Sequence, residues 1–540
     1  MVISINIFMI LALFLALSLF WCRRAISPRS LVITPAFCLL LTGALILTLP
    51  LAWATGYRFL NAAWRLAALA GGLAVLFTAL QITWRRQRVM GVLYSLVACT
   101  VVQLVIAGQQ LLMREAAWLP LYGRRAYGTF FQPNVLASFL ATGLAVTLIL
   151  LLLPVFTAHH ERTERRRRNG LRLLLALTAL MLVWIQSRTG ALGALGASVL
   201  LLWRFGARDR QTGFTAGALV AGALFGILTL HWGPASMLTI EHTHSNLARW
   251  DMVRDTLSMI AVHPWFGWGY GGFEYDFQHF RVHQVPPTVV TEIVRHPHNE
   301  ALLWIVEGGL VGLAGLIPVA VGGALVVRQA LRHDRPGAER PLTGLPTALC
   351  IALLPIALHT QLEFPFYVSA AHVTLFVLLF AMADRLGAPD RPDTGARHRG
   401  LYAGLALLCL GGAVGASYGV KGNQVLTQVE QFGMEDISPL VALPPFSRAL
   451  HQERVRFDEQ VNALLTYNHT RDATLLARYQ DWAQGYLYRR IDKNVYATLI
   501  QILQHQRQLA LAEQYRQEAQ RFFPQDARFF SPHNDHREMP

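Results

Sequence analysis

The chain has 540 residues, of which 54% are hydrophobic and only 15% are charged. Soluble proteins carry clearly fewer apolar and more charged residues, so this composition predicts a polytopic membrane protein. The formal net charge of +15 is concentrated between apolar stretches and indicates membrane topology. No soluble basic face is present, which argues against a nucleic-acid partner. The five cysteines lie in or beside apolar stretches and indicate no disulfide framework.

Apolar stretches of the length that crosses a bilayer as a helix recur along the whole chain. We therefore expect an all-α polytopic membrane protein with roughly twelve transmembrane helices. The span over 190–203 is short for a membrane helix. The expected spans are 3–21, 31–53, 61–82, 89–107, 134–157, 169–187, 190–203, 213–231, 299–327, 344–362, 366–384 and 400–419.

Arginine-rich clusters mark the connections on one side of these spans. Because positively charged loops are retained in the cytoplasm, that side is predicted to be cytoplasmic. Both termini then lie on the opposite, exported side, together with a large loop and a long C-terminal tail. The clusters lie at 21–29, 84–88, 161–169, 204–210, 328–340 and 384–399.

Four regions follow from this topology. The two membrane regions are separated by an exported loop, and the tail is charged and helical in pattern. We expect N-terminal transmembrane helices in 1–231, a periplasmic loop in 232–298, C-terminal transmembrane helices in 299–419 and a helical periplasmic domain in 420–540.

Polar residues gather first before the span at 134–157, in "YGRRAYGTFFQPNVLASFL" (122–140). Pro133 and Asn134 fit a helix start, so one interpretation of Asn134 is a local N-cap. Arg125 either reaches the membrane interface, as long basic side chains do, or faces a functional site. Gln132 stands beside them at the exported end of the span.

Further along the chain, "IQSRTGALGALGASVLL" (185–201) places Arg188 between two apolar segments. A charged residue near hydrocarbon is costly, so Arg188 is expected to have a partner or a function. The small residues that follow it favour close helix packing.

The exported loop contains two notable segments. "ARWDMVRDTLSMI" (248–260) has an amphipathic pattern, carries Arg249 and Arg254, and is expected to lie along the membrane surface. "HPWFGWGYGGF" (263–273) is rich in turns and aromatic residues. Such aromatics either stack on sugar rings or lie at the headgroup level of the bilayer.

The loop ends in "HPHNEALLWIVEGGLVG" (296–312), where His298 and Asn299 stand at the start of a span. His296 and His298, two residues apart, do not share a helix face, and no third ligand is adjacent, so we predict no metal here. A histidine at the membrane surface that accepts or relays a proton is the preferred interpretation.

This stretch resembles the signature of the O-antigen ligase and polymerase (WaaL/Wzy) superfamily, in which a His-Asn pair is followed by Gly-x-x-Gly. Here the positions are filled by His298, Asn299, Gly309 and Gly312. "GTFFQPNVLASFLA" (128–141) and "LEFPFYVSAAHVTLFVLLFAMAD" (362–384), with the helical tail, resemble bacterial protein O-oligosaccharyltransferases of the PglL kind.

The resemblance implies a bacterial inner-membrane glycosyltransferase whose active site faces the periplasm. Such enzymes transfer a preassembled oligosaccharide from an undecaprenyl-pyrophosphate carrier to Ser or Thr hydroxyls of periplasmic or pilin-like proteins. They use no cofactor. The partners implied are the lipid-linked glycan donor, an acceptor protein or lipid A core, and membrane lipids.

The resemblance also suggests roles for single residues. Arginine donates two hydrogen bonds to phosphate and never deprotonates, which suits it to a pyrophosphate leaving group. We expect Arg188 and Arg249 to stabilise that group and His298 to accept the proton of the acceptor hydroxyl. The expected substrate-binding residues are Arg125, Gln132, Asn134, Asn299, Arg254 and Glu363.

The tail after residue 420 shows helical periodicity from about 472 onward. Its last two helices resemble one tetratricopeptide-like hairpin, which commonly offers a groove to a peptide. A lid that packs on the membrane domain is an equal alternative.

Two other functions remain open at this point. One is an O-antigen ligase acting on lipid A core, or an O-antigen polymerase, either of which shares the donor half of the site. The other is a flippase or transporter, which should place ionisable residues along a path through the membrane and show paired broken helices. The polar residues here concentrate at one face, which favours chemistry there.

Overall fold

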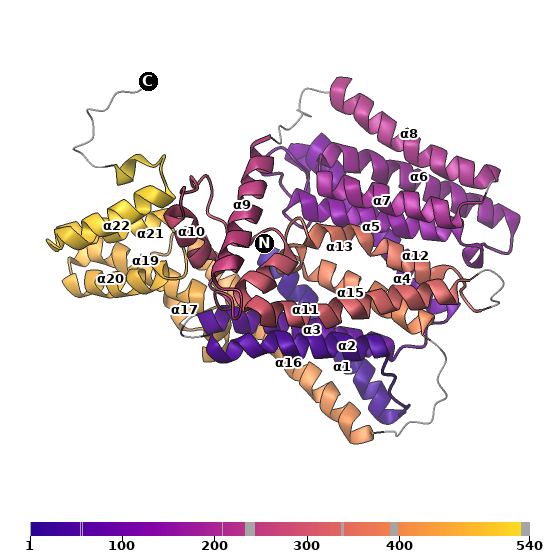
Figure 1. Ribbon diagram of the computed structural model, residues 1–540, viewed down its shortest axis with the longest axis horizontal. Helices are drawn as coiled ribbons and strands as arrows, with labels where there is room; N and C mark the ends of the chain where they lie inside the picture. Colours follow the sequence, from indigo (N-terminus) through magenta and orange to yellow (C-terminus); the bar gives the residue numbers. More distant parts are fainter. Residues whose placement is uncertain are drawn as a thin grey trace.

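A computed structural model describes residues 2–530 except 55, 57, 208, 233–242, 336–339 and 389–397. Its elements within that part of the chain are all helices, which confirms the predicted all-α polytopic fold (Figure 1). The start of the predicted exported loop (233–242) and the end of the predicted tail domain (531–540) lie outside the described residues.

Ten helices among the described residues are long and apolar enough to cross a membrane. Each coincides with a stretch expected from the sequence. They are α1 (Val2–Ile26), α2 (Pro35–Thr48, continued by η1, Leu49–Trp53), α3 (Arg58–Leu80), α4 (Arg86–Leu112), α5 (Pro133–Leu152), α6 (Glu161–Ile185), α8 (Arg210–Trp232), α11 (Glu300–His333), α15 (Ala370–Gly387) and α16 (Arg399–Gln431).

The other two expected spans are helical but shorter or less apolar. The stretch at 190–203 becomes α7 (Arg188–Phe205), whose two terminal arginines reduce its hydropathy. The stretch at 344–362 divides into α12 (Leu345–Ala352) and α13 (Leu354–Thr360). Pro355 in the first turn of α13 has no N–H to continue the hydrogen-bond ladder, which explains the interruption.

The remaining elements are shorter or lie outside the membrane bundle. They include η2 (Arg114–Ala116) after α4, η3 (Pro154–Phe156) between α5 and α6, α9 (Thr243–Val262) and α10 (Phe273–His283) between α8 and α11, and α14 (Pro365–Val368) before α15. The tail contains α17 (Ser438–Val441), α18 (Pro445–Leu450), α19 (Gln452–Thr470), α20 (Ala473–Leu487), α21 (Lys493–His505), α22 (Leu509–Phe522) and η4 (Ala527–Phe529).

The connections predicted to be cytoplasmic lie together at one end of the bundle. Arg86 at the start of α4 donates to the carbonyl oxygen of Val155 between α5 and α6, at 2.6 Å. Arg204 near the end of α7 donates to the carbonyl oxygen of Asp334 after α11, at 3.0 Å. These contacts join loops that the sequence assigns to one face. Which face is cytoplasmic remains a prediction.

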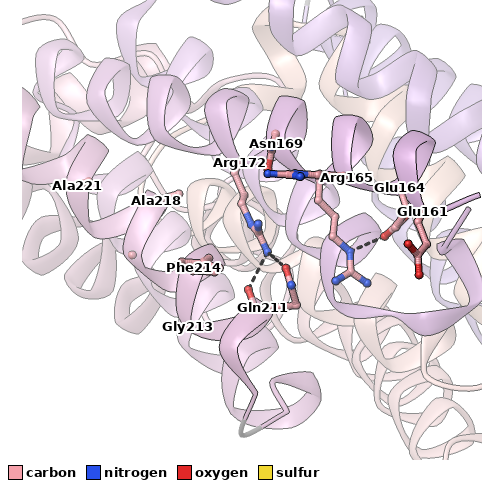
Figure 2. Close-up of a pocket in the computed structure, with 12 residues that line it drawn as sticks. Glu161, Glu164, Arg165, Asn169, Arg172, Gln211, Gly213, Phe214, Ala218 and Ala221 are labelled. Carbon is pink, nitrogen blue, oxygen red and sulfur yellow. Dashed lines mark hydrogen bonds and ion pairs between the residues drawn. The ribbon is translucent and has the colours of Figure 1, made fainter.

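A groove of about 990 Å³ opens between α6 and α8 at this basic end (Figure 2). Arg172 is bonded across it to the Gln211 carbonyl at 3.0 Å and to its side chain at 2.7 Å. Arg168 is paired with Glu164 of its own helix. The groove is lined by Glu161, Glu164, Arg165, Arg168, Asn169, Arg172, Gln211, Gly213, Phe214, Gly217, Ala218 and Ala221.

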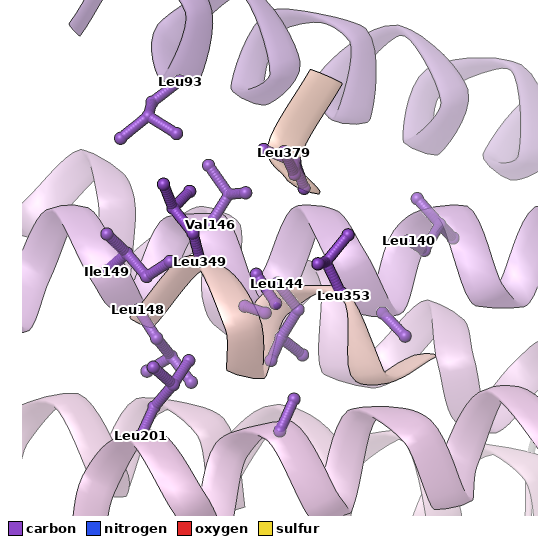
Figure 3. Close-up of a cluster of buried hydrophobic side chains, with 14 of the residues drawn as sticks. Leu93, Leu140, Leu144, Val146, Leu148, Ile149, Leu201, Leu349, Leu353 and Leu379 are labelled. Carbon is purple, nitrogen blue, oxygen red and sulfur yellow. The ribbon is translucent and has the colours of Figure 1, made fainter. Parts of the chain in front are cut away.

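Helix α5 forms the centre of the largest apolar core. It is apolar on all sides and almost completely buried, as expected for a helix surrounded by other helices. Leu140, Leu144 and Leu148 of α5 belong to this core together with Leu201 of α7 and Leu349 of α12 (Figure 3). The segment just before α5 is therefore held at a fixed depth at the end opposite the arginine-rich loops.

The tail packs on the exported loop through α10. Glu274, which is buried at the start of α10, accepts a hydrogen bond from Arg490 at 2.7 Å and one from the Ile491 N–H at 3.0 Å. His279 contacts Glu518 of α22 at 3.1 Å. Residues of α20, α21 and α22 share one apolar core, so the predicted helical pattern of the tail is confirmed.

Candidate functional site

The buried carboxylate of Glu363 lies at the centre of a polar cluster at the exported end predicted from the sequence. Arg249 of α9 forms an ion pair with its Oε1 atom, and Asn134 donates to the same oxygen. Gln132 donates to Oε2 at 3.1 Å, and the Nε2 atom of His359 lies 3.3 Å from Oε2. Three segments far apart in the sequence therefore meet at one side chain that is only 2% exposed.

The position of Gln132 and Asn134 follows from how the chain enters α5. Two buried glutamines of α4 hold the preceding segment: Gln110 Oε1 accepts from the Gly128 N–H at 2.9 Å, and Gln103 Oε1 accepts from the Thr129 N–H at 3.1 Å. Pro133 then begins the helix, where its missing N–H costs nothing. The sequence pattern did not single out either glutamine of α4.

Asn134 is not an N-cap, so that interpretation of its pattern was wrong. Gln132 occupies the cap position, and its side chain makes no capping hydrogen bond. The Asn134 amide bonds outward instead: its nitrogen donates to Glu363, and its oxygen accepts from Arg125 at 2.8 Å. A polar side chain in the first helical turn reaches neighbouring segments, because no earlier turn blocks it.

Arg125 and Arg188 belong to the same neighbourhood. The Nε atom of Arg125 donates to the Ile185 carbonyl at the end of α6, at 2.9 Å. Burial lowers the pKa of Arg125, and Glu363 opposes this effect. The positive charges of Arg249 and Arg188 lower it further. Three guanidinium groups thus influence one another close to a single carboxylate, which leaves an excess of positive charge.

Arg188 is the first residue of α7. The hydroxyl of Ser187 caps this helix by accepting from the Gly190 N–H at 3.3 Å. A Cβ atom on Gly190 would approach Ala137 of α5 to 2.4 Å, which confirms that the small residues allow close helix contact. The start of α7 therefore packs directly beside the start of α5.

Asn299 caps α11 and links it to the segment that carries Glu363. Its side-chain oxygen accepts from the Leu302 N–H at 2.9 Å, and its nitrogen donates to the Gln361 carbonyl at 3.1 Å. The oxygen and the nitrogen of the Asn299 side chain are thus both hydrogen-bonded to backbone groups of the protein. The role of Asn299 in binding substrate remains a prediction. Its observed contacts fix the backbone next to His298.

His298 adopts a left-handed backbone conformation, with φ of +54°, directly before the cap. Its ring packs edge-on against Phe364 at a centroid distance of 5.1 Å. Burial lowers the pKa of His298 to about 4, although the negative charge of Glu363 acts in the opposite direction. The imidazole is therefore neutral near pH 7 and able to accept a proton.

Burial alone would raise the pKa of Glu363, but its neighbours reverse this. Hydrogen bonding and the charge of His359, followed by the charge of Arg249, lower the pKa below its usual value. Glu363 is thus ionised at neutral pH. An ionised carboxylate is what keeps Arg249 in place.

His296 has local partners. Its Nδ1 atom accepts from the His298 N–H at 3.0 Å, and its Nε2 atom lies 3.6 Å from a carboxylate oxygen of Glu300. Its ring contacts Phe364 and Tyr367 at 5.0 Å each. These contacts fix the turn that presents His298.

The Gly-x-x-Gly part of the signature has a structural explanation. Helix α11 is broken at Gly309, where φ is +58° and ψ is −143°. A Cβ atom at this position would lie 2.5 Å from the Trp265 carbonyl oxygen. The Leu310 N–H donates to the Pro264 carbonyl at 2.8 Å, so the exported loop is hydrogen-bonded into the break. Glycine is needed here for both conformation and close approach.

Glu307 reinforces the same contact. It pairs with Arg65 of α3, and its Oε1 atom accepts from the backbone N–H groups of Gly271 and Phe273 at 3.1 and 3.2 Å. Arg65 stacks on Tyr270 at 4.7 Å from the ring centroid. The sequence pattern did not single out Arg65, because one arginine in a predicted apolar span gives no indication of its partner.

The aromatic segment 263–273 divides between two environments. Trp268 and Tyr270 pack inward, with the Trp268 indole donating to the Met259 carbonyl at 2.8 Å. Trp265 and Phe266 are exposed, and Phe266 contacts Trp53 at the end of the second span. The two predicted roles, anchoring at the membrane interface and stacking on sugar rings, therefore both remain open for Trp265 and Phe266.

The observed contacts of Arg254 do not include a residue of the Glu363 cluster. It lies five residues after Arg249 on α9, which turns it to another side of the helix. Its guanidinium contacts Asp251 at 3.2 Å, Asp255 at 3.1 Å and Thr288 at 3.2 Å. In Figure 1, α9 runs across the direction of α5 to α8, as a helix lying on the membrane surface would.

The groove of Figure 2 is remote from this cluster. It is lined by residues 161–172 of α6, whereas the cluster contacts the same helix at Ile185. Thirteen or more residues of helix separate the two places, which is about 20 Å or more along the axis. The groove is therefore not part of the candidate active site.

Comparison with protein families gives two matches. Residues 173–317 match the O-antigen ligase family, and residues 347–535 match the C-terminal part of the virulence factor membrane-bound polymerase family. No curated protein matches the chain. The fold and these matches define a multi-pass membrane protein of the class that joins glycans. Both matches support the superfamily of O-antigen ligases and polymerases (WaaL/Wzy).

The candidate site draws on both matched regions. Arg249 and His298 lie in the ligase match, whereas His359 and Glu363 lie in the polymerase match. Asn134 precedes both.

Proposed function

We propose that the protein transfers a preassembled oligosaccharide from an undecaprenyl-pyrophosphate carrier to Ser or Thr hydroxyls of periplasmic or pilin-like proteins. The observation that carries the proposal is the convergence of Arg249, Asn134 and Gln132 on Glu363, beside the neutral His298. This arrangement combines a cationic surface for a phosphate group with a base, at one end of a membrane bundle.

The reaction is a displacement at the anomeric carbon of the first sugar. The acceptor oxygen forms a new bond to that carbon, and the bond from the carbon to the pyrophosphate oxygen breaks. The hydroxyl proton passes to His298, and the carrier leaves as undecaprenyl pyrophosphate. Guanidinium groups stabilise the negative charge that develops on the leaving oxygen. We assign this role to Arg249 and Arg188, with Arg125 in support.

Glu363 is proposed to act as the anchor of this surface. It accepts from Arg249 through one guanidinium nitrogen, which leaves other N–H groups of the same fork for a phosphate oxygen. A charge held in advance requires no reorganisation when the leaving group forms. Gln132 and Asn134 restrain the carboxylate from the side of α5.

An O-antigen ligase acting on lipid A core, or an O-antigen polymerase, is the second candidate function. The names of the two matched families favour it. All three reactions share the lipid-linked donor and differ in the acceptor. We therefore test them by expressing the chain with a lipid-linked glycan pathway in cells that lack their own ligase. Sugar on pilin-like protein supports the proposal, whereas sugar on lipid A core or in longer glycan chains supports the second candidate.

Chelator treatment tests how the leaving group is stabilised. If arginines balance the pyrophosphate charge, the purified enzyme should retain full transfer activity in excess chelator. The measurement compares initial rates before and after chelation. Loss of activity that returns with Mg²⁺ or Mn²⁺ would contradict the arginine mechanism.

A further prediction concerns the tail, which we propose presents the acceptor polypeptide. Deleting the chain from about residue 490 would remove part of the core that α20 shares with α21 and α22, so a point variant is preferable. Arg490→Gln removes the ion pair with Glu274 and loosens the contact between tail and loop. We expect protein glycosylation to fall several-fold while slow hydrolysis of the lipid-linked donor is unchanged.

The matched control is Arg478→Gln, because Arg478 is an exposed residue of α20, and it should change neither rate. Both rates are measured on membranes that hold equal amounts of each variant. An equal fall in both rates for Arg490→Gln would identify the tail as a structural lid, and the acceptor site would then lie in the exported loop.

A further inference from the structure

A chain of buried polar side chains leads from Glu363 into the helix bundle. Its first contact joins Glu363 Oε2 to His359 Nε2 at 3.3 Å. The Nδ1 atom of His359 lies 2.7 Å from the Ser138 hydroxyl, which in turn lies 3.1 Å from His372 Nε2. The chain ends where His372 Nδ1 meets the Ser369 hydroxyl at 2.9 Å.

All five side chains are shielded from solvent. His359, His372 and Ser138 are 0% exposed, and Glu363 and Ser369 are 2% and 3% exposed. They come from α5, α13, α15 and the turns beside them, and most residues of these helices are apolar. Such a set of polar groups is costly to bury unless every member is bonded.

The chemistry of the carboxylate fixes the first donor of the chain. A carboxylate only accepts hydrogen bonds, so a proton of His359 is on Nε2 and faces Glu363. The Ser138 hydroxyl lies 2.7 Å from His359 Nδ1 and 3.1 Å from the Val135 carbonyl oxygen. The Ser138 oxygen can accept from His372 Nε2–H, and the Ser369 hydroxyl can donate to His372 Nδ1. The Ser369 hydroxyl also accepts from the His372 backbone N–H as the cap of α15.

We infer that His359, Ser138 and His372 are positioning residues that hold the Glu363 carboxylate in place and keep it ionised. This inference rests on the proposed function of the Glu363 cluster and deepens it. His359 contacts Oε2 of the carboxylate, whereas Arg249 contacts Oε1, and we assign the three residues no contact with substrate.

The groups facing Glu363 explain why such a support is needed. From α9 it faces Arg249, from the start of α5 it faces Asn134 and Gln132, and His298 acts on it electrostatically. A phosphate group that binds Arg249 competes with Glu363 for the positive charge of the guanidinium group. A donor fixed by the bundle, which substrate does not displace, keeps the carboxylate charged throughout the cycle.

The test compares variants of His359 that keep or remove the donor. His359→Gln retains an N–H able to reach Glu363, whereas His359→Leu has none. Without the donor, burial favours the neutral acid, so the acidic limb of the rate profile should move to higher pH in His359→Leu. We expect the midpoint of the acidic limb to rise by about one pH unit relative to wild type, and the ratio of the rates at pH 5 and pH 8 to fall with it. His359→Gln should stay close to wild type.

A second, smaller substitution is included because His359→Leu could lower the rate by disturbing the fold. Ser138→Ala removes the hydroxyl that orients His359 and should move the limb in the same direction by a smaller amount. Thr147→Ala is its matched control, because Thr147 is a buried hydroxyl of α5 that bonds only to the Gly143 carbonyl of its own helix. This control should leave the limb unchanged. Lower rates with unmoved acidic limbs in His359→Leu and Ser138→Ala would overturn the inference.

An infrared titration separates this inference from the proposed function, since it needs neither donor nor acceptor. The carboxyl band of Glu363 is identified by its absence in Glu363→Gln. It should appear at higher pH in His359→Leu and Ser138→Ala than in wild type or Thr147→Ala. If the band titrates alike in all four proteins, the inference fails even where glycan transfer is observed. If the band shifts but no transfer is found, only the proposed function fails.

Discussion

Replacing His298 is expected to abolish glycan transfer, because the acceptor hydroxyl then loses its base. General base catalysis typically contributes 10²–10⁴-fold, so the rate should fall by about that factor. The preferred substitution is His298→Asn, since asparagine tolerates the left-handed conformation at φ of +54°. It keeps a polar side chain but has no basic nitrogen. The measurement is the initial rate of transfer, with donor binding determined separately.

The control for this experiment is His296→Asn. His296 lies beside His298, contacts Phe364 and Tyr367, and is not proposed to touch substrate. We expect this variant to lose part of the activity by loosening the turn, with a raised KM and a smaller change in kcat. Full transfer activity in His298→Asn, with equal protein in the membrane, would exclude His298 as the base.

The pH dependence of the wild-type enzyme provides a related check. The pKa of His298 is lowered to about 4, so its neutral, proton-accepting form dominates above that pH and is lost below it. Glu363, whose pKa is also lowered, stays ionised over the same range. Both groups therefore place the acidic limb of activity below the range of an ordinary histidine.

The membrane fold was largely predictable, because each span carries its own signal. A helix in hydrocarbon must be apolar for about twenty residues, and every predicted stretch contains a helix. The exceptions have local causes. The pattern could not reveal that Pro355 divides one stretch, or that α11 is broken at Gly309 while its apolar sequence continues.

The cluster itself was only partly predictable. His298 was selected at the start of a span, Arg249 on an amphipathic segment of the exported loop, and Glu363 from the family resemblance. Their mutual contacts are not encoded locally, since Arg249 and Glu363 are 114 positions apart. The rule for helix N-caps gave the wrong interpretation of Asn134, because its side chain does not cap α5 and instead donates a hydrogen bond to Glu363.

The supporting residues were not predictable at all from pattern. Ser138, His359 and His372 each stand alone among apolar residues, where the usual interpretation is an isolated polar group within a core. The role proposed for them depends on the contacts of Ser138 with His359 and His372, which are 221 and 234 positions away in the sequence. Arg254 was expected to bind substrate, and its observed contacts are to Asp251 and Asp255 on its own helix, so that role stays a prediction.

Arg249→Lys is expected to reduce transfer markedly towards every acceptor. Lysine keeps the positive charge but replaces the planar fork with a single ammonium group, which cannot bond to Glu363 and to a phosphate in the same geometry. Removing one preorganised donor of this kind typically costs 10²–10³-fold in rate, and we expect a loss of about that size. Initial rates are measured with a protein acceptor and with lipid A core.

Glu363→Gln should cause a similar loss by a different route. The amide keeps the shape of the side chain but removes the charge that holds Arg249. Because the two residues act as a unit, the double variant should be little worse than either single one. Losses that multiply in the double variant would show that the pair does not work together.

Arg254→Lys is the matched control on the same helix. Arg254 is more exposed than Arg249 and is already paired with Asp251 and Asp255, so its replacement should leave transfer unchanged. If Arg254→Lys is as damaging as Arg249→Lys, general loss of charge on α9 explains both effects and the fork has no special role. If Arg249→Lys impairs only the protein acceptor, Arg249 belongs to the acceptor side, and the phosphate must be held by Arg125 and Arg188.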